Sequence, residues 1–466
     1  MLFKDYMKVI PGLFVGKFCI TFSRYFNFGG STLPGKLASC ISPHLLPILA
    51  SQLKEGSILI TGTNGKTTTA YLLAGILSRA GKKVIHNRTG ANLIFGVTTP
   101  FIAESTYVGK IKADVGVLEV DEASMPAVAS QLPVKGVIVT NLFPDQLDRF
   151  GELQYTLDLI ARGIDSLDKN SFVLLNADDP LVSSLKKDVR TIYYGIDDVK
   201  EVSGLNGHAS DIKMCYRCGN KYEYIHTHFS HLGIYKCPGC GLSRPRPQYS
   251  IISRFNKPNH NTEAAIKIPG SLFRIPVKIP GFYNLYNILA AVSCALELGV
   301  KKNVIKSSLQ DFTAAFGRME LLDIDGKKIY LILIKNPTGA NEVLRTLMEE
   351  DIETSLIFAI NDRYADGTDV SWLWDADFEL LADPHNKIRF IFCSGTRGED
   401  MAVRLKYAGI DTKLIKYEKD MRKAFIEGLN QTPKGGVLQL MLTYTALLEL
   451  RKIINEMGYG SKFWEC

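Results

Sequence analysis

Residues 62–68 read GTNGKTT, between an apolar run at 57–61, SILIT, and a segment of helical character at 67–81, TTTAYLLAGILSRAG. A strand, a tight glycine turn and a helix N-terminus gather several backbone N–H groups around one point, and these donors and the helix dipole favour phosphate. A full Walker A motif would have glycine at position 60, where this chain has Ile60. A glycine turn with a solvated lysine is the alternative, but the flanking strand and helix favour a phosphate-binding loop.

The side chains of this loop have predicted roles toward ATP. Lys66 would reach the β- and γ-phosphates, and the Thr67 hydroxyl would ligate Mg²⁺. A magnesium ion prefers further carboxylate, water or phosphate oxygens. The run VGVLEVDEAS carries three carboxylates to the end of a predicted strand, where α/β sheets place ligands, although a solvated acidic loop is the alternative. The residues expected to contact nucleotide are Thr63, Asn64, Gly65, Lys66, Thr67 and Thr68, and the three carboxylates are Glu119, Asp121 and Glu122.

The length and composition of the chain indicate a soluble globular protein. Its 466 residues are enough for two or three domains, and 46% hydrophobic with 22% charged residues is an ordinary balance. The net charge of +7 is compatible with anionic substrates but too spread out to indicate nucleic acid. No apolar run approaches the length of a membrane-spanning helix. Five scattered cysteines fit reduced thiols and a cytoplasmic location, namely Cys19, Cys40, Cys294, Cys393 and Cys466.

The N-terminal segment, MLFKDYMKVIPGLFVGKFCITFSRYF, is apolar and basic and has no signal-peptide cleavage site. We expect an amphipathic helix packed on the domain. The alternative is a helix whose basic side touches a membrane surface.

From residue 57 onward, short β-branched runs alternate with amphipathic segments, which is typical of a parallel sheet with crossover helices. The pattern stops near Val202 and a Cys/His/Tyr-rich stretch follows. A second α/β unit with its own apolar runs begins after the connector FTAAFGRMELL at 312–322. The chain is therefore predicted to contain two α/β domains, with domain closure over ATP about that connector.

Four cysteines form two C-x2-C knuckles, which are typical of a tetrahedral structural zinc site. They are Cys215, Cys218, Cys237 and Cys240. His226, His228 and His231 lie between the knuckles and are alternative ligands, but four thiolates already make a closed set without an open catalytic position. A zinc ribbon in a nucleic-acid-binding ATPase is another interpretation, and the insert lacks the basic and aromatic cluster that it requires.

Several motifs, taken in order, resemble the Mur ligases and folylpolyglutamate synthases, which join a carboxylate to an amine with ATP. They are TGTNGKTT, NADDP at 176–180, GFYNLYN at 281–287 and FGRME at 316–320. The resemblance implies a central ATP-binding domain at 51–312 with a zinc ribbon inserted at about 205–247. A helical segment at 1–50 would precede it and a Rossmann-like α/β domain at 313–466 would follow. It also implies that Asn284, Asn287 and Arg318 contact ATP, and that Glu119 or Glu122 binds Mg²⁺.

One branch of this family is a closer match, the synthetase subunits of lipid II isoglutaminyl synthase. The features that carry the match are LEVDEAS at 118–124, TNLFPDQLDRFGE at 140–152, the four-cysteine insert and NDRYADGTDVSWLWD at 361–375. The resemblance implies ATP-dependent amidation of the α-carboxylate of D-isoglutamate in lipid II. Ammonia would come from a glutaminase partner bound through the C-terminal domain, and no glutaminase nucleophile pair is recognisable in this chain. Asp366 or Asp369 would then orient ammonia or complete the partner's site. An Asp-rich turn that caps the next helix is the alternative.

The departures from the family pattern favour amidation over the addition of an amino acid. Ligases that add an amino acid have D-H-L-D where this chain has Gln146 in place of the histidine. Their carbamylated lysine would fall near Ile160 or Ala161, and their D-x-A-H-N-P is here ILIKNP at 332–337. Ammonia needs no pocket for a carboxylated side chain. A ligase of the Mur or folylpolyglutamate type that adds an amino acid remains the second hypothesis.

Overall fold

The computed structural model describes residues 3–25, 32–87, 90–143, 150–185, 188–198, 213–257, 261–312, 318–348, 353–383, 385 and 387–459. The chain divides into two compact units with the main boundary between Phe312 and Thr313. Gln146 and the 313–317 part of the predicted connector lie outside the described residues. Residues 318–322 of that connector belong to a strand, so the predicted connector was too long at its C-terminal end.

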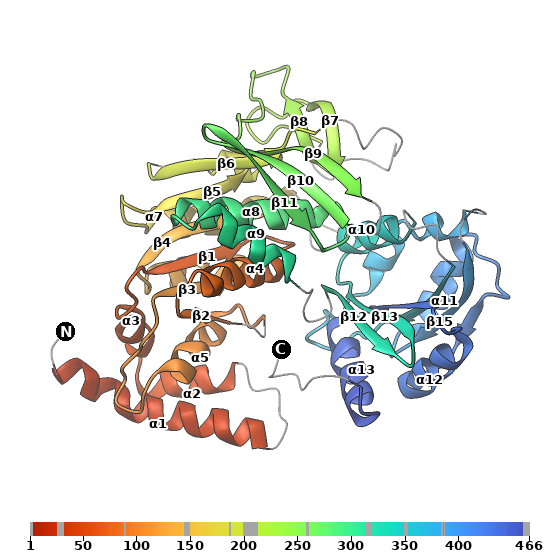
Figure 1. Ribbon diagram of the computed structural model, residues 1–466, viewed down its shortest axis with the longest axis horizontal. Coiled ribbons are helices and arrows are strands. Elements are labelled where there is room, and N and C mark those ends of the chain that lie inside the picture. Colours follow the sequence, from red (N-terminus) through yellow and green to blue (C-terminus); the bar gives the residue numbers. More distant parts are fainter. Residues whose placement is uncertain are drawn as a thin grey trace. The chain divides into compact units, whose positions relative to one another are not determined.

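The first unit is built on a nine-stranded sheet in the order β11-β10-β9-β6-β5-β4-β1-β3-β2 (Figure 1). Its strands are β1 (Ser57–Thr61), β2 (Val84–His86), β3 (Val115–Glu119), β4 (Val134–Val139), β5 (Phe172–Asn176), β6 (Arg190–Ile196), β9 (Tyr249–Lys257), β10 (Asn261–Ile268) and β11 (Ser271–Val277). The apolar runs predicted as strands form β1 to β5, which pair in parallel. The parallel sheet predicted from the alternating runs is extended at one edge by β9, β10 and β11, which pair antiparallel with one another.

Helices cover both faces of this sheet. They are α1 (Phe3–Tyr25), α2 (Leu33–Ile41), α3 (Leu45–Ala50), α4 (Lys66–Arg79), α5 (Ile94–Glu104), α6 (Met125–Ala129), α7 (Phe150–Asp165), α8 (Tyr283–Glu297) and α9 (Lys302–Gln310), with short 3₁₀ turns η1 (Glu122–Ser124) and η2 (Val182–Ser184). Helix α4 packs with α8 and α9, whereas α5, α6 and α7 share a core with the other face of the central strands. The strands are buried on both faces, as parallel central strands must be.

A two-stranded hairpin, β7 (Glu223–Phe229) with β8 (Leu232–Lys236), stands between the two cysteine knuckles. It is inserted in sequence between β6 and β9, and the latter two strands pair in parallel. The insert therefore leaves the main sheet continuous.

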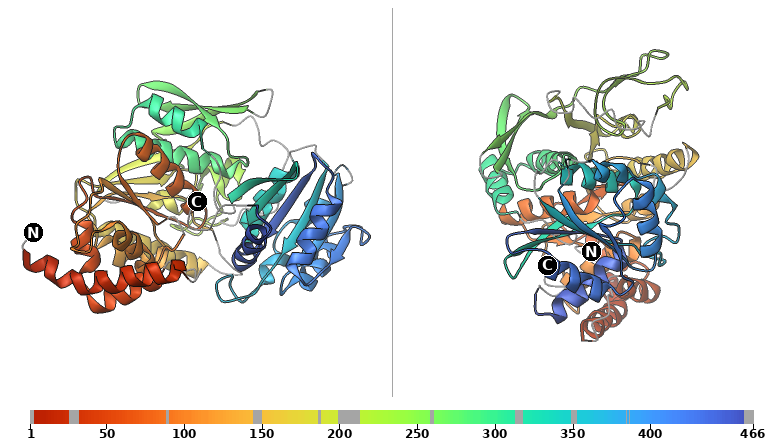
Figure 2. Two further views of the ribbon diagram at one scale, coloured as in Figure 1. Left: turned by 60° about the horizontal axis from the view of Figure 1, so that its bottom comes forward. Right: turned by 90° about the vertical axis from the view of Figure 1, so that its right-hand side faces the viewer.

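The second unit has a six-stranded sheet in the order β12-β13-β17-β14-β15-β16, parallel except for β12. Its elements are β12 (Arg318–Ile324), β13 (Lys327–Leu333), α10 (Pro337–Met348), β14 (Thr354–Ala359), η3 (Ser371–Trp374), η4 (Phe378–Ala382), β15 (Ile388–Ser394), α11 (Gly398–Tyr407), β16 (Ile415–Tyr417), α12 (Met421–Gln431), β17 (Val437–Leu442) and α13 (Tyr444–Glu456). Helices α10 and α11 contribute to one core, and α12 and α13 contribute to the core on the other face (Figure 2). The carboxyl ends of β13, β17, β14 and β15 consequently meet at one edge.

Candidate nucleotide site

The turn between β1 and α4 requires glycine at two positions. Gly62 has φ 120° and Gly65 has φ 86°, conformations that L side chains rarely adopt. A Cβ at Gly65 would lie 2.1 Å from the Asn287 Oδ1 atom of α8. The loop is thus pressed against α8, and a side chain at Gly65 would displace one of them. Gly65 also precedes the first residue of α4, so that the helix N-terminus opens at the loop.

Lys66 is buried and points back into the loop. Its Nζ donates to the Gly62 carbonyl oxygen at 2.5 Å and pairs with Glu122 Oε1 at 2.8 Å. Burial on its own would lower the pKa of Lys66, but Glu122 and Glu119 outweigh it and raise the pKa above its ordinary value. The ammonium is therefore a fixed positive charge at the mouth of the loop.

The two candidate carboxylates have different partners. Glu119, at the end of β3, is buried, and its Oε2 accepts a hydrogen bond from Thr67 Oγ1 at 2.8 Å. Glu122 lies in η1 and is paired with Lys66. The side chain of Asn87, which follows β2, brackets Glu119, since it donates to the Glu119 carbonyl at 2.8 Å and accepts from the Glu119 N–H at 2.9 Å. The structure thus joins one carboxylate to the loop hydroxyl and the other to the loop lysine.

The segment after β4 supports the loop from the side. The Asn141 amide accepts from the Asn64 N–H at 2.9 Å and donates to the Asn64 carbonyl at 3.0 Å, and Thr140 Oγ1 donates to the same carbonyl at 2.8 Å. The Thr63 hydroxyl accepts from the Phe143 N–H at 3.0 Å. Asn87 and Asn141 were missed from the sequence. Each stands one or two residues after a predicted strand, where parallel strands end at one edge, and that position was the available signal.

The predicted adenine-side residues lie on α8. Asn287 and Asn284 are buried and bonded to each other, Nδ2 to Oδ1, at 3.0 Å. Asn287 Oδ1 also lies 3.5 Å from Thr69 Oγ1 of α4. The structure therefore brings Asn287 to the phosphate loop itself. Thr68 is buried on the first turn of α4 and Arg318 begins β12 of the second unit.

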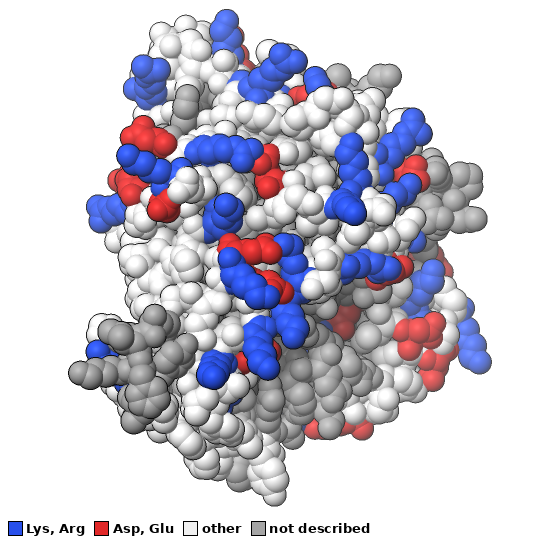
Figure 3. All heavy atoms as spheres, turned by 60° about the vertical axis from the view of Figure 1, so that its left-hand side comes forward, with Lys and Arg blue, Asp and Glu red and all other residues white. Residues whose placement is uncertain are grey.

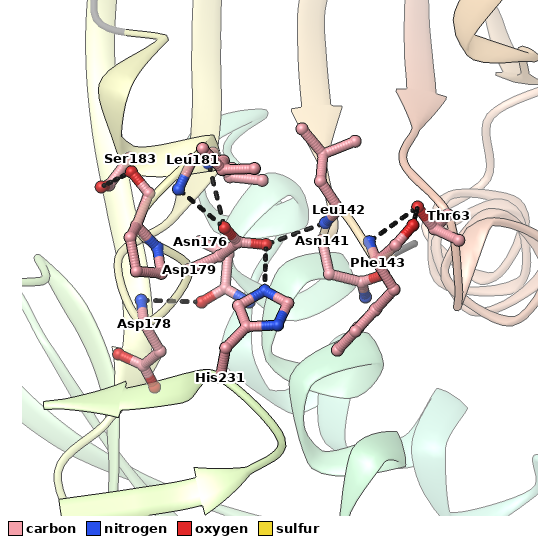
Figure 4. A network of polar contacts seen from close by, with 12 residues as sticks. Thr63, Asn141, Leu142, Phe143, Asn176, Asp178, Asp179, Leu181, Ser183 and His231 are labelled. Carbon is pink, nitrogen blue, oxygen red and sulfur yellow. Dashed lines mark hydrogen bonds and ion pairs between the residues drawn. The ribbon is translucent and has the colours of Figure 1, made fainter. Parts of the chain in front are cut away.

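The NADDP segment after β5 is a buried structural junction (Figure 4). Asp179 Oδ2 accepts from the Leu142 N–H at 2.8 Å and lies 3.4 Å from His231 Nε2 of the hairpin. Asp178 accepts from Arg244 Nε at 2.5 Å and from the Tyr286 hydroxyl at 2.7 Å. Although burial works against its charge, Asp178 and Asp197 raise the pKa of Arg244, so the guanidinium stays ionised. This motif joins the cysteine insert and α8 to the central sheet.

The four knuckle cysteines converge. Their Sγ atoms all lie within 4.8 Å of one another, with Cys215 to Cys240 at 3.7 Å and Cys218 to Cys237 at 3.4 Å. Burial disfavours the Cys215 thiolate, but the N–H groups of Arg217 and Cys218 outweigh it and lower the pKa to about 6. Such thiolate sets at these separations suit a tetrahedral metal ion.

The three histidines of the insert stand apart from this cluster. His228 Nε2 lies 2.9 Å from the Ile196 carbonyl oxygen, and burial lowers the pKa of His228. The His226 ring meets the His228 ring edge to face, with the ring centroids 4.7 Å apart. His231 is fully buried beside Asp179. Among the described residues, these four cysteines form the group whose ligand atoms could together hold a metal ion.

In the second unit, the acidic loop after β14 is held by helix-capping bonds. Asp366 accepts from the Thr445 N–H at 2.6 Å and from the Thr445 hydroxyl at 2.5 Å, at the N-terminus of α13. Asp369 is exposed, and its Oδ1 accepts from the Ser371 N–H at 2.8 Å, which lowers its pKa. In η3, which follows the acidic loop, Trp372 is buried and Trp374 is exposed beside Tyr407.

Two family models match the chain. The Mur ligase middle domain matches residues 60–235, and the MurT ligase C-terminal model matches residues 333–447. The chain is 36% identical, over 91% of its length and 92% of the relative's, to the lipid II isoglutaminyl synthase (glutamine-hydrolyzing) subunit MurT of Streptococcus pneumoniae. It is 33% identical to the MurT subunit of Staphylococcus aureus, over 98% and 100% of the two chains. The chain belongs to the MurT branch of the Mur ligase family.

Solved structures share this fold at low identity. The pseudomurein peptide ligase type C of Methanothermus fervidus matches with a TM-score of 0.65 and 23% identity, over 88% of this chain and 80% of that one. MurF of Acinetobacter baumannii matches with a TM-score of 0.65 and 16% identity, over 91% and 80%. The family membership confirms the predicted resemblance, and the fold is that of the Mur ligases.

The junction at Asp178 gives a stability prediction. Replacing Asp178 by Asn leaves the buried Arg244 guanidinium without its closest carboxylate, and the free energy of unfolding should fall by about 3–5 kcal/mol. Urea unfolding would measure it. The matched control is Asp311→Asn, which removes a solvent-exposed pair with Arg79 and should cost about 1 kcal/mol or less. Equal losses in the two variants would contradict a supporting role for Asp178.

Proposed function

We propose that this chain is the synthetase subunit of a lipid II isoglutaminyl synthase. It uses ATP to amidate the α-carboxylate of D-isoglutamate in the stem peptide of lipid II, which gives D-isoglutamine for peptidoglycan. The match to MurT subunits over nearly the whole chain carries the proposal. The ordered phosphate loop, with its buried lysine, supports the use of ATP.

The reaction divides into two balanced steps. In the first step, a carboxylate oxygen of the substrate attacks the γ-phosphorus of ATP, the bond to the bridging oxygen breaks and ADP leaves, so that an acyl phosphate forms. In the second step, the ammonia nitrogen attacks the acyl carbon, a proton is lost and inorganic phosphate leaves. The first step is needed because oxide is a poor leaving group from a carboxylate.

The residues of the loop have distinct parts in this scheme. Lys66 would exchange its ion pair with Glu122 for the transferring phosphate and neutralise charge there. The N–H groups at the start of α4 would hold the phosphates, and Asn284 and Asn287 of α8 would lie beside the nucleotide. We propose Glu119 and Thr67 as the Mg²⁺ ligands, because they already share a hydrogen bond. The ion would shield the phosphate charges.

The departures from amino-acid-adding ligases support ammonia as the nucleophile. Ile160, where the carbamylated lysine is expected, is fully buried in the core, and Ala161 packs against the same core. Asn336, in the segment that replaces D-x-A-H-N-P, is buried and accepts from the Gly339 N–H at 2.8 Å to cap α10. Ile160 and Ala161 thus offer no polar side chain for an incoming amino acid, and the Asn336 carboxamide is used to cap α10.

We propose three further assignments. Ammonia comes from a glutaminase subunit that forms a heterodimer with this chain through the C-terminal domain, where Asp366 and Asp369 lie. The four cysteines hold a structural Zn²⁺ ion, since a closed thiolate set suits that metal and offers no open position. The scattered reduced thiols and the use of ATP favour a cytoplasmic location, at the inner face of the membrane that holds the substrate.

An amidation assay tests the central proposal. The purified chain is incubated with lipid II, MgATP and ammonium chloride, and ADP release and product mass are followed. We expect ADP together with the small mass decrease that accompanies replacement of OH by NH₂. ATP turnover that requires an added amino acid, with the product gaining its mass, would instead make this chain a conventional ligase.

Substitutions separate the two glutamates near the loop. Glu119→Gln should raise the Mg²⁺ concentration for half-maximal ADP release by at least about 10-fold. Removing a residue that only supports a metal ligand commonly lowers metal affinity by about 10-fold or more, and Glu119 is proposed as a ligand itself. Glu122→Gln is the matched control and should leave the Mg²⁺ midpoint in place. Lys66→Ala should abolish turnover. A Mg²⁺ midpoint that moves in Glu122→Gln and not in Glu119→Gln would reverse the assignment.

The two loop aspartates should behave differently. Asp366→Asn weakens the cap of α13 and should lower the free energy of unfolding by about 1 kcal/mol. Asp369→Asn should leave stability near that of the parent and abolish amidation with glutamine and the partner. Activity with ammonium chloride then tells whether Asp369 completes the partner's site or orients ammonia.

The matched control is Asp411→Asn, because Asp411 makes the same kind of bond, to the Lys413 N–H at 2.9 Å. It should keep both activities. Full activity of Asp369→Asn with both nitrogen sources would refute a catalytic part for this residue.

Metal analysis tests the cysteine site. The purified chain should contain a single Zn²⁺ ion, and Cys218→Ser should lose it and unfold at a lower temperature, because structural zinc contributes folding free energy. Cys19→Ser removes a cysteine outside the cluster and should keep the metal. A metal-free chain with an unchanged melting temperature would exclude a structural zinc.

A further inference from the structure

Helix α1 has two apolar rows rather than one. The inner row, Val9, Gly12, Leu13 and Gly16, is buried. At Gly12 a Cβ would lie 2.7 Å from the Ala38 carbonyl oxygen of α2, and at Gly16 it would lie 3.0 Å from Ile102 of α5. This row accounts for the predicted packing of an N-terminal helix on the domain. Figures 1 and 2 show α1 and α2 side by side at one end of the first unit.

The outer row of α1 is aromatic and exposed. Phe14, Phe18, Phe22 and Tyr25 have relative exposures of 54%, 69%, 48% and 82%. Their spacing of three or four residues puts them on one side of the helix. The Phe18 and Phe22 rings stack at 6.1 Å. Burying such rings would release about 1.5–3 kcal/mol each, so a row of them left in water calls for an occupant.

Neighbouring elements add to this exposed apolar surface. On α2, three aliphatic residues at helical spacing, Leu33, Leu37 and Ile41, are exposed. After α5, Tyr107 and Val108 are exposed, and the Tyr107 ring lies 5.2 Å from the Phe14 ring. We call the surface formed by these nine residues the N-terminal apolar surface.

After Asp5, near the start of α1, the charged residues of α1 and α2 are all basic. Between Asp5 and Glu55 the sequence has no acidic residue, but it has Lys8, Lys17 and Lys36 within the described helices. Lys17 Nζ lies 5.3 Å from the centroid of the Tyr107 ring, at the edge of the surface. In Figure 3 the spheres at the bottom of the view are mostly white, the colour of residues other than Lys, Arg, Asp and Glu. Apolar rings bordered by lysines complement a lipid surface, which has anionic headgroups and an apolar interior.

We propose that the N-terminal apolar surface docks on an anionic membrane surface, with the α1 aromatic row at the level of the lipid headgroups and the lysines on the phosphates. No helix in the described part of the chain is long and apolar enough to cross a bilayer, so this contact is peripheral. Aromatic side chains favour the membrane–water boundary, and a basic helix gains about 1 kcal/mol per Lys near an anionic surface. This inference rests on the proposed function, because docking would bring the nucleotide loop to the membrane plane, where a lipid-linked substrate resides.

A vesicle flotation experiment tests the docking. The full-length protein is mixed with vesicles of phosphatidylglycerol and phosphatidylcholine, or of phosphatidylcholine alone, at low and high salt. We expect flotation with the anionic vesicles that weakens at high salt. Phe18→Ser/Phe22→Ser should reduce bound protein at least about 10-fold, because two rings no longer partition. Lys8→Glu/Lys36→Glu should abolish the preference for anionic lipid.

The matched control is Ile225→Ser/Leu272→Ser, which removes two exposed apolar side chains outside the N-terminal helices and should bind like the parent. Amidation of a water-soluble stem-peptide analogue should be unchanged in the Phe18/Phe22 variant, whereas amidation of lipid II in vesicles should fall. Absence of flotation of the parent overturns the docking proposal whatever the amidation assay shows. So does equal flotation of the Phe18/Phe22 variant, or a change in that variant confined to self-association or partner binding.

Discussion

The buried carboxylate of Asp178 is the interaction on which the arrangement of the first unit depends. It takes the Arg244 guanidinium on one side and the Tyr286 hydroxyl on the other, and it also accepts from the Ile196 N–H at 2.8 Å. Tyr286 is followed on α8 by Asn287, whose Oδ1 occupies the space that a Cβ at Gly65 would need. A charge that is costly to bury is thereby fully paired, and the pairing fixes α8 against the phosphate loop.

The cysteine insert is attached to the central sheet through the same junction. Arg244 follows the second knuckle, and His231 sits at the end of the hairpin between the knuckles, beside Asp179. A metal that holds the insert together would also hold these two side chains in place under the sheet. The insert lies far in sequence from the phosphate loop. Its His231 nevertheless lies beside Asp179, which accepts a hydrogen bond from the Leu142 N–H in the segment after β4.

Local pattern was enough to predict the phosphate loop, the central strands and the cysteine knuckles, because each depends on residues close together in sequence. The antiparallel pairing of β9 to β11 was not predicted, since their mixed polar and apolar residues are typical of an edge that is only half buried. The separate partners of Glu119 and Glu122 were left open for another reason. They stand three residues apart, and only the end of β3 with the 3₁₀ turn after it decides which one meets Thr67 and which one meets Lys66.

The acidic loop and helix α1 each contribute to the packing of the protein and also leave side chains exposed. Asp369 accepts from the Ser371 N–H at the start of η3, the next helical turn, as the alternative of a capping turn predicts, whereas Asp366 bonds to the N-terminus of the distant α13. Accepting a hydrogen bond leaves an exposed carboxylate its charge, so this contact is compatible with the role proposed for Asp369. For the N-terminal segment, the sequence left two alternatives, a helix packed on the domain and a helix in contact with a membrane surface. Because the inner row is built partly from glycines that allow close approach, α1 packs on the domain without using its large aromatic side chains, and these remain for a second surface.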